Sequence, residues 1–348
     1  MPLHPLVGHA DARRRIAAAH RGGRLPQVLL LTGPPGIGRQ RLGLWVAQLL
    51  LCERPAEEPC GTCGACRLVL GLAHPDLHWL VPIPRPKGDV DRQVDEAAEA
   101  LAQAMEDRRA APLYGRVDGM ASHGMASVRL LLRRAALTPV QSRIKVFLVG
   151  DAERLVPQES SPEAANALLK LLEEPPADTW FVLTAADPRR LLPTIRSRAV
   201  PLRLGRLTDA EVTRVLGRAA PEADGAPGSA LGGGTGLAAY QAAAAFLDSV
   251  AAGSGDRLER ALGQPAFAAR GDFTALLDAL ADTLADAARS ASGAKPRRPL
   301  PPAVRGRRDP AALVAAMQRV AAVREAAAGN VNPQLLLAAL ADDLAEAL

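Results

Sequence analysis

The sequence has few aromatic residues, few cysteines and no long apolar run. Aromatic residues make up 3% of the 348 positions, whereas alanine and leucine dominate the second half, which favours helices there. No apolar run reaches the roughly 18 to 20 residues of a membrane helix, and the first residues lack the apolar core of a secretion signal. We therefore expect a cytoplasmic protein with no membrane partner.

The charge excess is small and does not by itself identify a partner. The net charge is +5 with a hydrophobic content of 48%, so the composition permits a substantial core, and the length suffices for two or three domains. A mildly basic chain is compatible with nucleic-acid binding, but many basic proteins bind none. Arg133, Arg134, Arg143 and Lys145 are candidate phosphate contacts, although such charges usually form a solvated face.

The four cysteines are clustered as Cys52, Cys60, Cys63 and Cys66, in the pattern C-x7-C-x2-C-x2-C. Four thiolates satisfy tetrahedral Zn²⁺ and leave no position open for water, which indicates a structural zinc module over 52–66 rather than a catalytic centre. Cys52 is the least certain ligand. The alternatives are a core cysteine beside three free thiols, or a nucleic-acid-binding ribbon, for which basic and aromatic residues within the module are few.

Short apolar segments alternate with helical patterns over the first two hundred residues. The segments that predict strands are 27–32, 74–82, 143–150, 179–186 and 199–204. This alternation predicts a parallel, doubly wound sheet. Ser161 and Pro162 are expected to begin the helix that Pro175 ends, and Glu173 and Glu174 to end that helix and position its neighbours. His74 and His78 are expected to shape the start of the second strand.

The segment 85–125 and the last third of the chain have different patterns. Within 85–125, one helical face carries an apolar stripe made of Val90, Val94, Ala97, Leu101 and Met105. The pattern changes near 207 and again near 236. Residues 237–348 read as helices rich in alanine and leucine, interrupted by "GAKPRRPLPPAVRGRRDP", which we expect to form a mobile loop with solvated arginines.

The stretch "LLLTGPPGIGRQR" at 29–41 has the pattern of a phosphate-binding P-loop, with Gly33, Gly36 and Gly38 in the turn. Arg39 stands where lysine is usual, and Gln40 replaces the Ser or Thr that binds Mg²⁺. After the strand at 143–150, Gly150 occupies the place of the metal-orienting aspartate and Asp151 that of the catalytic glutamate. We favour a turn that only packs strand against helix, so that ATP or ADP binding is not expected; an unusual nucleotide site is the alternative.

Three features together resemble the bacterial clamp-loader subunits of DNA polymerase III, which are AAA+ proteins. They are "HPDLHWLVP", "NALLKLLEEPPADTWFVLTAADPRRLLPTIRSRA" and the cysteine cluster. The resemblance covers about residues 6–207. The altered P-loop, the missing aspartate and an apolar Ala185 at the sensor position make the chain similar to the delta-prime branch, which does not hydrolyse ATP. No second sensor arginine is found near "GGGTGLAA".

This resemblance implies a domain plan and a role. It implies an α/β AAA+ P-loop domain over 1–207 with the zinc module, a small helical lid over 208–236 and an all-α collar domain over 237–348. In "IRSRA", Ser197 and Arg198 match the family's Ser-Arg-Cys motif, with Ala199 in place of cysteine, and Arg198 would be an arginine finger that acts on a neighbouring subunit. The alternative for Arg198 is a salt bridge within its own chain.

The resemblance also implies partners. They would be the gamma/tau and delta subunits, the β sliding clamp and primer-template DNA, and the chain would be a non-hydrolysing stator in clamp loading. Two other functions are kept open: an ATP-hydrolysing gamma/tau-like subunit that uses Arg39 in an unusual P-loop, and a zinc-containing nucleic-acid-binding protein that works outside a clamp loader.

Overall fold

The chain folds into two compact units, Met1–Ser229 and Ala230–Leu348. The computed structural model describes residues 3, 6–84, 86, 90–111, 121–155, 163–220, 223–231, 235–264, 272–327 and 331–347. The division at Ser229 falls inside the segment 208–236 that the sequence assigns to a lid. The three-domain division with boundaries near 207 and 236 therefore stays a prediction.

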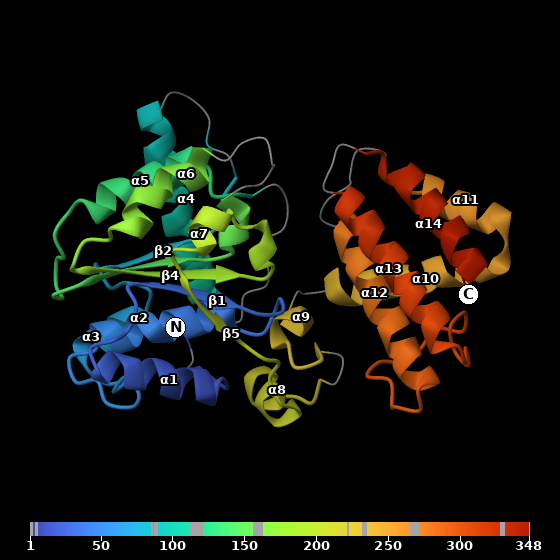
Figure 1. Ribbon diagram of the computed structural model, residues 1–348, viewed down its shortest axis with the longest axis horizontal. Helices are drawn as coiled ribbons and strands as arrows, with labels where there is room; N and C mark the ends of the chain where they lie inside the picture. The colour runs from blue at the N-terminus through green and yellow to red at the C-terminus, as the bar shows by residue number, and fades with distance from the viewer. Residues whose placement is uncertain are drawn as a thin grey trace. The chain divides into compact units, whose positions relative to one another are not determined.

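The first unit is built on a five-stranded parallel sheet, and the predicted parallel fold is confirmed (Figure 1). Its strands are β1 (Val28–Thr32), β2 (Leu77–Leu80), β3 (Lys145–Val149), β4 (Thr179–Ala185) and β5 (Val200–Arg203), in the order β2-β3-β4-β1-β5. Each lies within one of the five segments predicted to be strands. All residues of β1 and β3 are buried, because helices cover both faces of the sheet, and this explains their unbroken apolar sequences.

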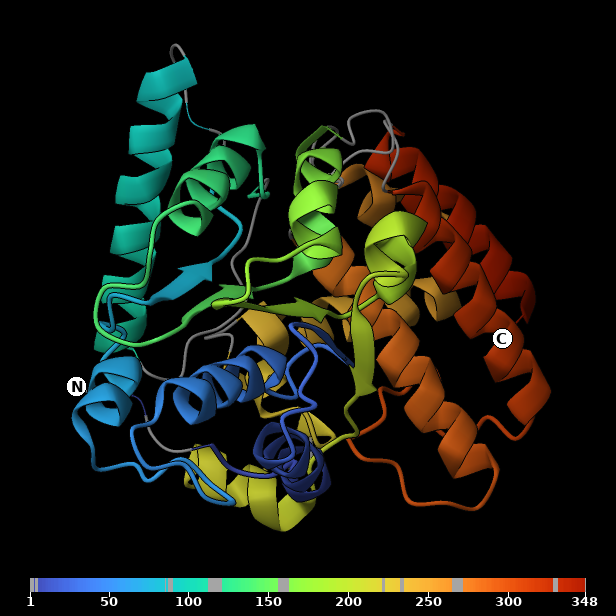
Figure 2. The same cartoon turned by 60° about the vertical axis from the view of Figure 1, so that its left-hand side comes forward.

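Two helical layers enclose the sheet. One face carries α1 (Ala10–Arg21), α2 (Arg39–Leu51) and α3 (Gly64–Leu70), and the other carries α4 (Val90–Ala110), α5 (Met125–Ala135) and α6 (Glu163–Glu173), as Figures 1 and 2 show. The shorter elements are η1 (Ala152–Leu155), η2 (Pro188–Arg190), α7 (Pro193–Arg196), α8 (Asp209–Leu216) and α9 (Pro227–Leu231). Because α2 is buried along most of its length, its sequence is apolar on nearly all sides.

Two helix predictions differ in their outcome. The apolar stripe predicted inside 85–125 is confirmed, since Val94, Ala97 and Leu101 of α4 are buried in the core of the first unit. The predicted helix start at Ser161 and Pro162 lies outside the described residues. The described part of that helix, α6, ends at Glu173, two residues before Pro175.

The second unit is a bundle of helices with its own core. It contains α10 (Thr235–Ala252), α11 (Ser254–Leu262), α12 (Asp272–Ala291), α13 (Pro310–Ala326) and α14 (Pro333–Ala347). Phe246 and Phe273 are fully buried in this core. In the described parts of the chain, no helix is both long and apolar enough to span a bilayer.

The segment between α12 and α13 is a loop with exposed arginines at 305, 307 and 308, as predicted, but part of it is buried. Leu300 and Val304 are buried in the core of the second unit. Arg298 is only 12% exposed and forms ion pairs with Asp282 and Asp286. The prediction of a solvated segment was wrong for Leu300, Val304 and Arg298. The two apolar side chains pack in the core, and Arg298 pairs with carboxylates of α12.

The turn that precedes β3 is held by a carboxylate at the start of β2. Asp76 accepts hydrogen bonds from the backbone N–H groups of Val140, Gln141 and Ser142, and His74 lies between the Asp76 N–H and the Ser142 hydroxyl. Burial acts to raise the pKa of Asp76, but the three N–H donors outweigh it and the pKa is lowered. His74 thus shapes the start of the strand, as expected, while the larger role of Asp76 was not predicted.

We expect Asp76→Asn to lower the free energy of unfolding by about 2 kcal/mol near neutral pH, because the amide offers fewer acceptor sites and no charge. Since the pKa of Asp76 is lowered in the folded state, its contribution is complete above the unfolded pKa of about 3.9 and is lost as the pH falls through the lower folded value. The difference between variant and wild type should therefore shrink toward about pH 3, which calorimetry at several pH values measures.

The exposed Asp95 on α4 offers a matched control, since Asp95→Asn removes a carboxylate that no described N–H group contacts. We expect this control to change stability by less than about 0.5 kcal/mol. Equal destabilisation by the two variants, or a loss in Asp76→Asn that does not depend on pH, would contradict the assignment.

Candidate functional site

The glycine-rich turn lies at the carboxyl edge of the sheet, where open α/β sheets bind ligands. It joins β1 to the first residue of α2, and Gly33, Gly36 and Gly38 all have positive φ angles, of 148°, 78° and 94°. Residues with side chains adopt such angles rarely, which explains the three glycines. The turn therefore requires glycine at these three positions.

Arg39 does not extend away from this turn but folds back onto it. Its guanidinium donates to the carbonyl oxygen of Gly33 at 2.6 Å and also to that of Pro34. A second guanidinium nitrogen lies 3.5 Å from the Asp151 carboxylate. Arg39 is 7% exposed, so its charge is held inside the protein by these oxygen atoms. The cation that a phosphate would require is thus bound to groups of its own chain.

The Gln40 side chain packs closely against Gly150 at the carboxyl edge of the sheet. The Gln40 amide donates to Asp151 at 3.1 Å. A Cβ atom placed on Gly150 would lie 2.7 Å from the Gln40 side chain, so an aspartate at 150 would collide with Gln40 unless the glutamine moved. The two departures from the P-loop ATPase pattern are therefore sterically linked: the amide occupies the space that a metal-orienting carboxylate needs.

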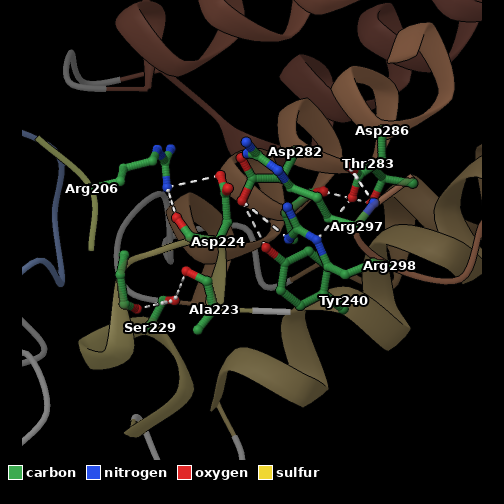
Figure 3. A network of polar contacts seen from close by, with 12 residues as sticks. Arg206, Ala223, Asp224, Ser229, Tyr240, Asp282, Thr283, Asp286, Arg297 and Arg298 are labelled. Carbon is green, nitrogen blue, oxygen red and sulfur yellow. Dashed lines mark hydrogen bonds and ion pairs between the residues drawn. The ribbon is translucent and has the colours of Figure 1, made fainter. Parts of the chain in front are cut away.

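The segment that follows β5 closes against the turn. The Gly228 N–H donates to the Gly36 carbonyl at 2.9 Å, and a Cβ atom on Gly36 would lie 2.9 Å from the Ser229 nitrogen. The segment is itself fixed, because Arg206 donates to the Asp224 carbonyl at 2.6 Å and pairs with its carboxylate (Figure 3). Glycine at 36 and 228 permits this close backbone contact at the mouth of the turn.

Three polar residues near the turn were missed in the sequence. Glu153 is buried and accepts from the Ala186 N–H at 2.9 Å; burial and the nearby Asp151 raise its pKa. His123 is buried and donates to the Gly150 carbonyl at 2.6 Å, and burial lowers its pKa to about 4, so it is neutral at pH 7. Thr184 accepts from the Asp151 N–H. No spacing rule links these residues, since they come from different segments.

These contacts limit the chemistry of the carboxyl edge. A P-loop ATPase needs a cation free to reach phosphate and a carboxylate that orients Mg²⁺. Here Arg39 pairs with Asp151, and residue 150 has no side chain. The apolar Ala185 ends β4, as the sequence indicated. The sequence "GGGTGLAA", near which no second sensor arginine is found, begins at residue 232. Residues 232–234 lie outside the described chain, so this expectation stays a prediction.

Ser197 and Arg198 lie between α7 and β5. The Ser197 hydroxyl donates to the Thr194 carbonyl at 3.0 Å. Arg198 donates to the same carbonyl at 2.9 Å and pairs with Glu173 of α6 at 3.0 Å. The arginine side chain is 26% exposed and the glutamate 58%, so solvent screens this ion pair and it contributes little to stability. Glu173 thus positions a neighbour, and the salt bridge weighed as an alternative for Arg198 is present.

Arg198 and the glycine-rich turn lie at opposite edges of the sheet. β5 and β1 are parallel, and Val200 pairs with Leu29, whereas the turn begins at Gly33. At about 3.3 Å per strand residue, Arg198 lies roughly 20 Å from the turn along the strand direction. An arginine side chain cannot bridge that distance, so the two predicted site elements are not parts of one site within this chain.

The four cysteines come together where α2 ends and α3 begins. Their sulfur atoms all lie within 4.8 Å of one another, with Cys52 and Cys63 at 4.0 Å and Cys60 and Cys66 at 3.9 Å. Tetrahedral zinc with Zn–S bonds of about 2.3 Å requires sulfur separations of roughly 3.8 Å. The group can therefore hold a metal ion, and Cys52, the least certain of the predicted ligands, is part of it.

Backbone N–H groups surround the sulfur atoms of the cysteines. The N–H groups of Cys60, Cys63 and Cys66 point to the sulfur atoms of Cys52, Cys60 and Cys63 at 3.3 to 3.4 Å. Backbone N–H groups of Thr62 and Cys63 lower the pKa of Cys60 to about 6, while burial raises the pKa of Cys66. Such N–H···S bonds support metal-bound thiolates. The connecting loop is fixed by Glu58, which accepts from Trp45 and Arg13.

The parallel sheet, the glycine-rich turn after β1 and the covering helices define an α/β protein of the P-loop class. A family model described as DNA polymerase III, delta subunit, matches residues 8–208, which is more than half of the chain. The chain belongs to this family, and its curated relatives place it in the delta-prime branch.

Two relatives illustrate the match. The DNA polymerase III subunit delta′ of Escherichia coli K12 is 34% identical over 185 residues, which cover 53% of this chain and 44% of that protein. The delta′ subunit of Pseudomonas aeruginosa PAO1 is 38% identical over 173 residues, which cover 49% and 40%. The match thus spans less than half the length of these curated relatives.

Other relatives carry a different subunit name. The gamma/tau subunit of Mycobacterium tuberculosis H37Rv is 31% identical over 202 residues, covering 57% of this chain and 28% of that protein. Among solved structures, a DNA polymerase III gamma subunit-related protein of Thermotoga maritima has a TM-score of 0.37 at 15% identity, covering 97% of this chain and 99% of its own. A structural similarity of this size adds nothing to the family assignment.

We expect Arg39→Ala to lower the free energy of unfolding by about 2–3 kcal/mol, because it leaves the Asp151 carboxylate and the Gly33 and Pro34 carbonyls without their cation. In Arg39→Ala/Asp151→Asn, part of this loss should be recovered, since no unpaired charge is left inside. Magnesium ATP should not raise the thermal midpoint of the wild type. Differential scanning fluorimetry measures all three.

Arg14→Ala, which removes an exposed arginine paired with Asp11, is the control for Arg39→Ala, and we expect a change below about 1 kcal/mol. If magnesium ATP stabilises the wild type and this effect disappears in Arg39→Ala, Arg39 binds phosphate and the turn is a working nucleotide site.

Proposed function

We propose that this protein is a non-hydrolysing stator subunit of a bacterial DNA polymerase III clamp loader. In this role it assembles with gamma/tau and delta subunits and supports ATP-dependent loading of the β sliding clamp onto primed DNA in the cytoplasm. Arg198 completes the ATP site of a neighbouring subunit, and Ser197 shapes the backbone that presents it. An arginine suits this task because it is planar, always charged and able to stabilise charge during phosphoryl transfer.

The observation that carries the proposal is the separation of the two charged groups. Arg39 is bound to its own turn and to Asp151 at the carboxyl edge. Arg198 lies at the amino edge, partly exposed, and is retained by a single solvent-screened carboxylate. A chain whose own cation is internally bound, and whose Arg198 lies at the opposite edge of the sheet from that turn, is suited to act on the nucleotide of another subunit.

Two rival functions predict different outcomes. An ATPase like the gamma/tau relatives requires Arg39 to leave Asp151 and reach phosphate, and magnesium-dependent hydrolysis by the isolated chain would support it. A zinc-containing nucleic-acid binder outside a loader would bind DNA tightly without any AAA+ partner. The ion pair of Arg39 and the contact between Gly36 and Gly228 weigh against the first of these functions.

We assign the cysteine group to structural zinc. Cys52, Cys60, Cys63 and Cys66 supply four thiolates at suitable separations, which leaves no coordination position for substrate or water. Zinc bound there joins the end of α2 to the start of α3, and thereby fixes the segment that leads into β2.

We expect Arg198→Ala to leave assembly with cognate gamma/tau and delta subunits intact and to reduce DNA-stimulated ATP hydrolysis by the complex. An arginine finger accelerates hydrolysis by about 10³-fold or more. Without it, the neighbouring subunit's site should hydrolyse almost no ATP, and the rate of the complex should fall by the contribution of that site. Size-exclusion chromatography reports assembly, and a coupled phosphate assay reports hydrolysis.

Glu173→Gln is the matched control, because it breaks the same ion pair but keeps the arginine. Hydrolysis should stay near the wild-type level in this variant, and Arg198→Lys should give an intermediate rate, since lysine keeps the charge but not the planar fork. Equal losses in Glu173→Gln and Arg198→Ala, or no loss in Arg198→Ala, would show that Arg198 only stabilises its own chain.

We expect the wild-type protein to purify with a single zinc ion, and Cys63→Ser to lose it and to melt at a lower temperature. Because the ligands are thiolates, zinc should also be released as the pH falls. Inductively coupled plasma mass spectrometry measures the bound metal. Arg67→Ala changes an exposed residue next to Cys66 and should retain zinc; full zinc retention by Cys63→Ser would refute the four-cysteine site.

A further inference from the structure

Positive charge in the second unit is concentrated in one short stretch, residues 289–308, here called the basic segment. It contains seven of the twelve Lys and Arg residues of 230–348 and none of the twelve Asp and Glu residues of that region. Six of the seven are arginines. The second unit, although uncharged overall, therefore carries a strong local excess of positive charge.

One end of the basic segment is fixed to α12 and α10 through Arg298. The guanidinium pairs with Asp286 at 3.0 Å and Asp282 at 3.3 Å, and lies over the Tyr240 ring at 4.3 Å (Figure 3). The Tyr240 hydroxyl donates to Asp282, and Asp286 also accepts from the Arg297 N–H at 3.1 Å. One cation and two carboxylates thus serve to hold the segment rather than to bind a partner.

The other part of the basic segment is fixed by apolar contacts and backbone bonds. Leu300, Pro301 and Val304 are buried, and the Ala303 N–H donates to Asp248 at 3.3 Å. Arg305 donates to the Leu300 carbonyl through two nitrogen atoms. The backbone between α12 and α13 therefore has a defined path, and the ordering cost of binding a ligand is largely met in folding.

Four other cations of the basic segment are exposed to solvent. Arg289, Lys295, Arg307 and Arg308 are exposed, and within the described chain no carboxylate pairs with any of them. The larger apolar side chains of the same segment, Leu300 and Val304, are buried. The exposed surface thus carries these cations among small residues and prolines, on a fixed backbone.

We propose that the basic segment binds the phosphate backbone of DNA without regard to sequence. Arginine forks match phosphate oxygens, and the segment contains no aromatic residue that could stack on bases. A membrane is disfavoured, because surface binding to lipid needs exposed large apolar side chains as well as charge, and Leu300 and Val304 are buried. The binding extends the proposed function, since it gives this chain its own contact with DNA.

The test compares two triple variants of the full-length chain that lose equal charge. Lys295→Ala/Arg307→Ala/Arg308→Ala removes three exposed cations of the basic segment. Arg15→Ala/Arg203→Ala/Arg214→Ala removes three exposed arginines of the first unit. Fluorescence anisotropy with a labelled duplex oligonucleotide, at several salt concentrations, gives the affinity and its salt slope. No partner subunit or ATP is needed, so failure here is distinct from failure of the hydrolysis experiment.

We expect the segment variant to bind duplex DNA at least about tenfold more weakly at low salt, and its slope of log K against log salt to be smaller by up to about 2.7, because each phosphate contact contributes about 0.9. The first-unit variant should keep the wild-type slope. Equal losses in both variants would show a net-charge effect and overturn the proposal, as would an unchanged slope in the segment variant.

Two further measurements keep the result decisive. If the triple variant melts at a lower temperature, Lys295→Ala/Arg308→Ala replaces it, since the described structure gives neither side chain a hydrogen bond, and the slope should fall by up to about 1.8. Anionic lipid vesicles and a poly-glutamate peptide serve as alternative ligands. The proposal would be overturned if the wild-type protein bound either ligand more tightly than DNA at equal charge concentration, and if the triple variant lost that binding.

Discussion

The parallel pairing of β1 with β4 and β5 is the constraint on which the arrangement of both predicted sites depends. Parallel strands place all their carboxyl ends at one edge, so the glycine-rich turn after β1, Asp151 after β3 and Ala186 after β4 meet there. The same pairing places Arg198, which precedes β5, at the other edge. A single sheet thus presents two charged groups that cannot serve the same ligand within one chain.

At the carboxyl edge, Arg39 pairs with Asp151 and donates to the carbonyl oxygens of its own turn. Gln40 fills the space above Gly150, and Gly228 donates to Gly36 across the mouth of the turn. Protein donors thus bind the carbonyl oxygens of Gly33, Pro34 and Gly36. The turn joins β1, α2 and the segment after β5, whereas Arg198 lies at the other edge and is partly exposed.

The two units use charged residues in different ways. In the first, most of the charged groups described around the turn pair inside the chain. In the second, Arg298 pairs with Asp282 and Asp286 and thereby presents the other cations of its segment to solvent. The same residue type therefore acts as an internal link at one position and as a surface charge a few residues away, and only the surroundings distinguish the two roles.

The sequence by itself determined the strands, their parallel direction and the cysteine group, because apolar alternation, turn residues and ligand spacing are local properties. It also located Arg39, Gly150 and Arg198. Only the tertiary structure decided that Arg39 binds Asp151, that Asp76 holds the turn before β3, and that Glu153 and His123 lie beside the glycine-rich turn. It likewise fixed the segment between α12 and α13, whose composition predicts a mobile loop. These outcomes depend on contacts between residues distant in the chain, which no local pattern encodes.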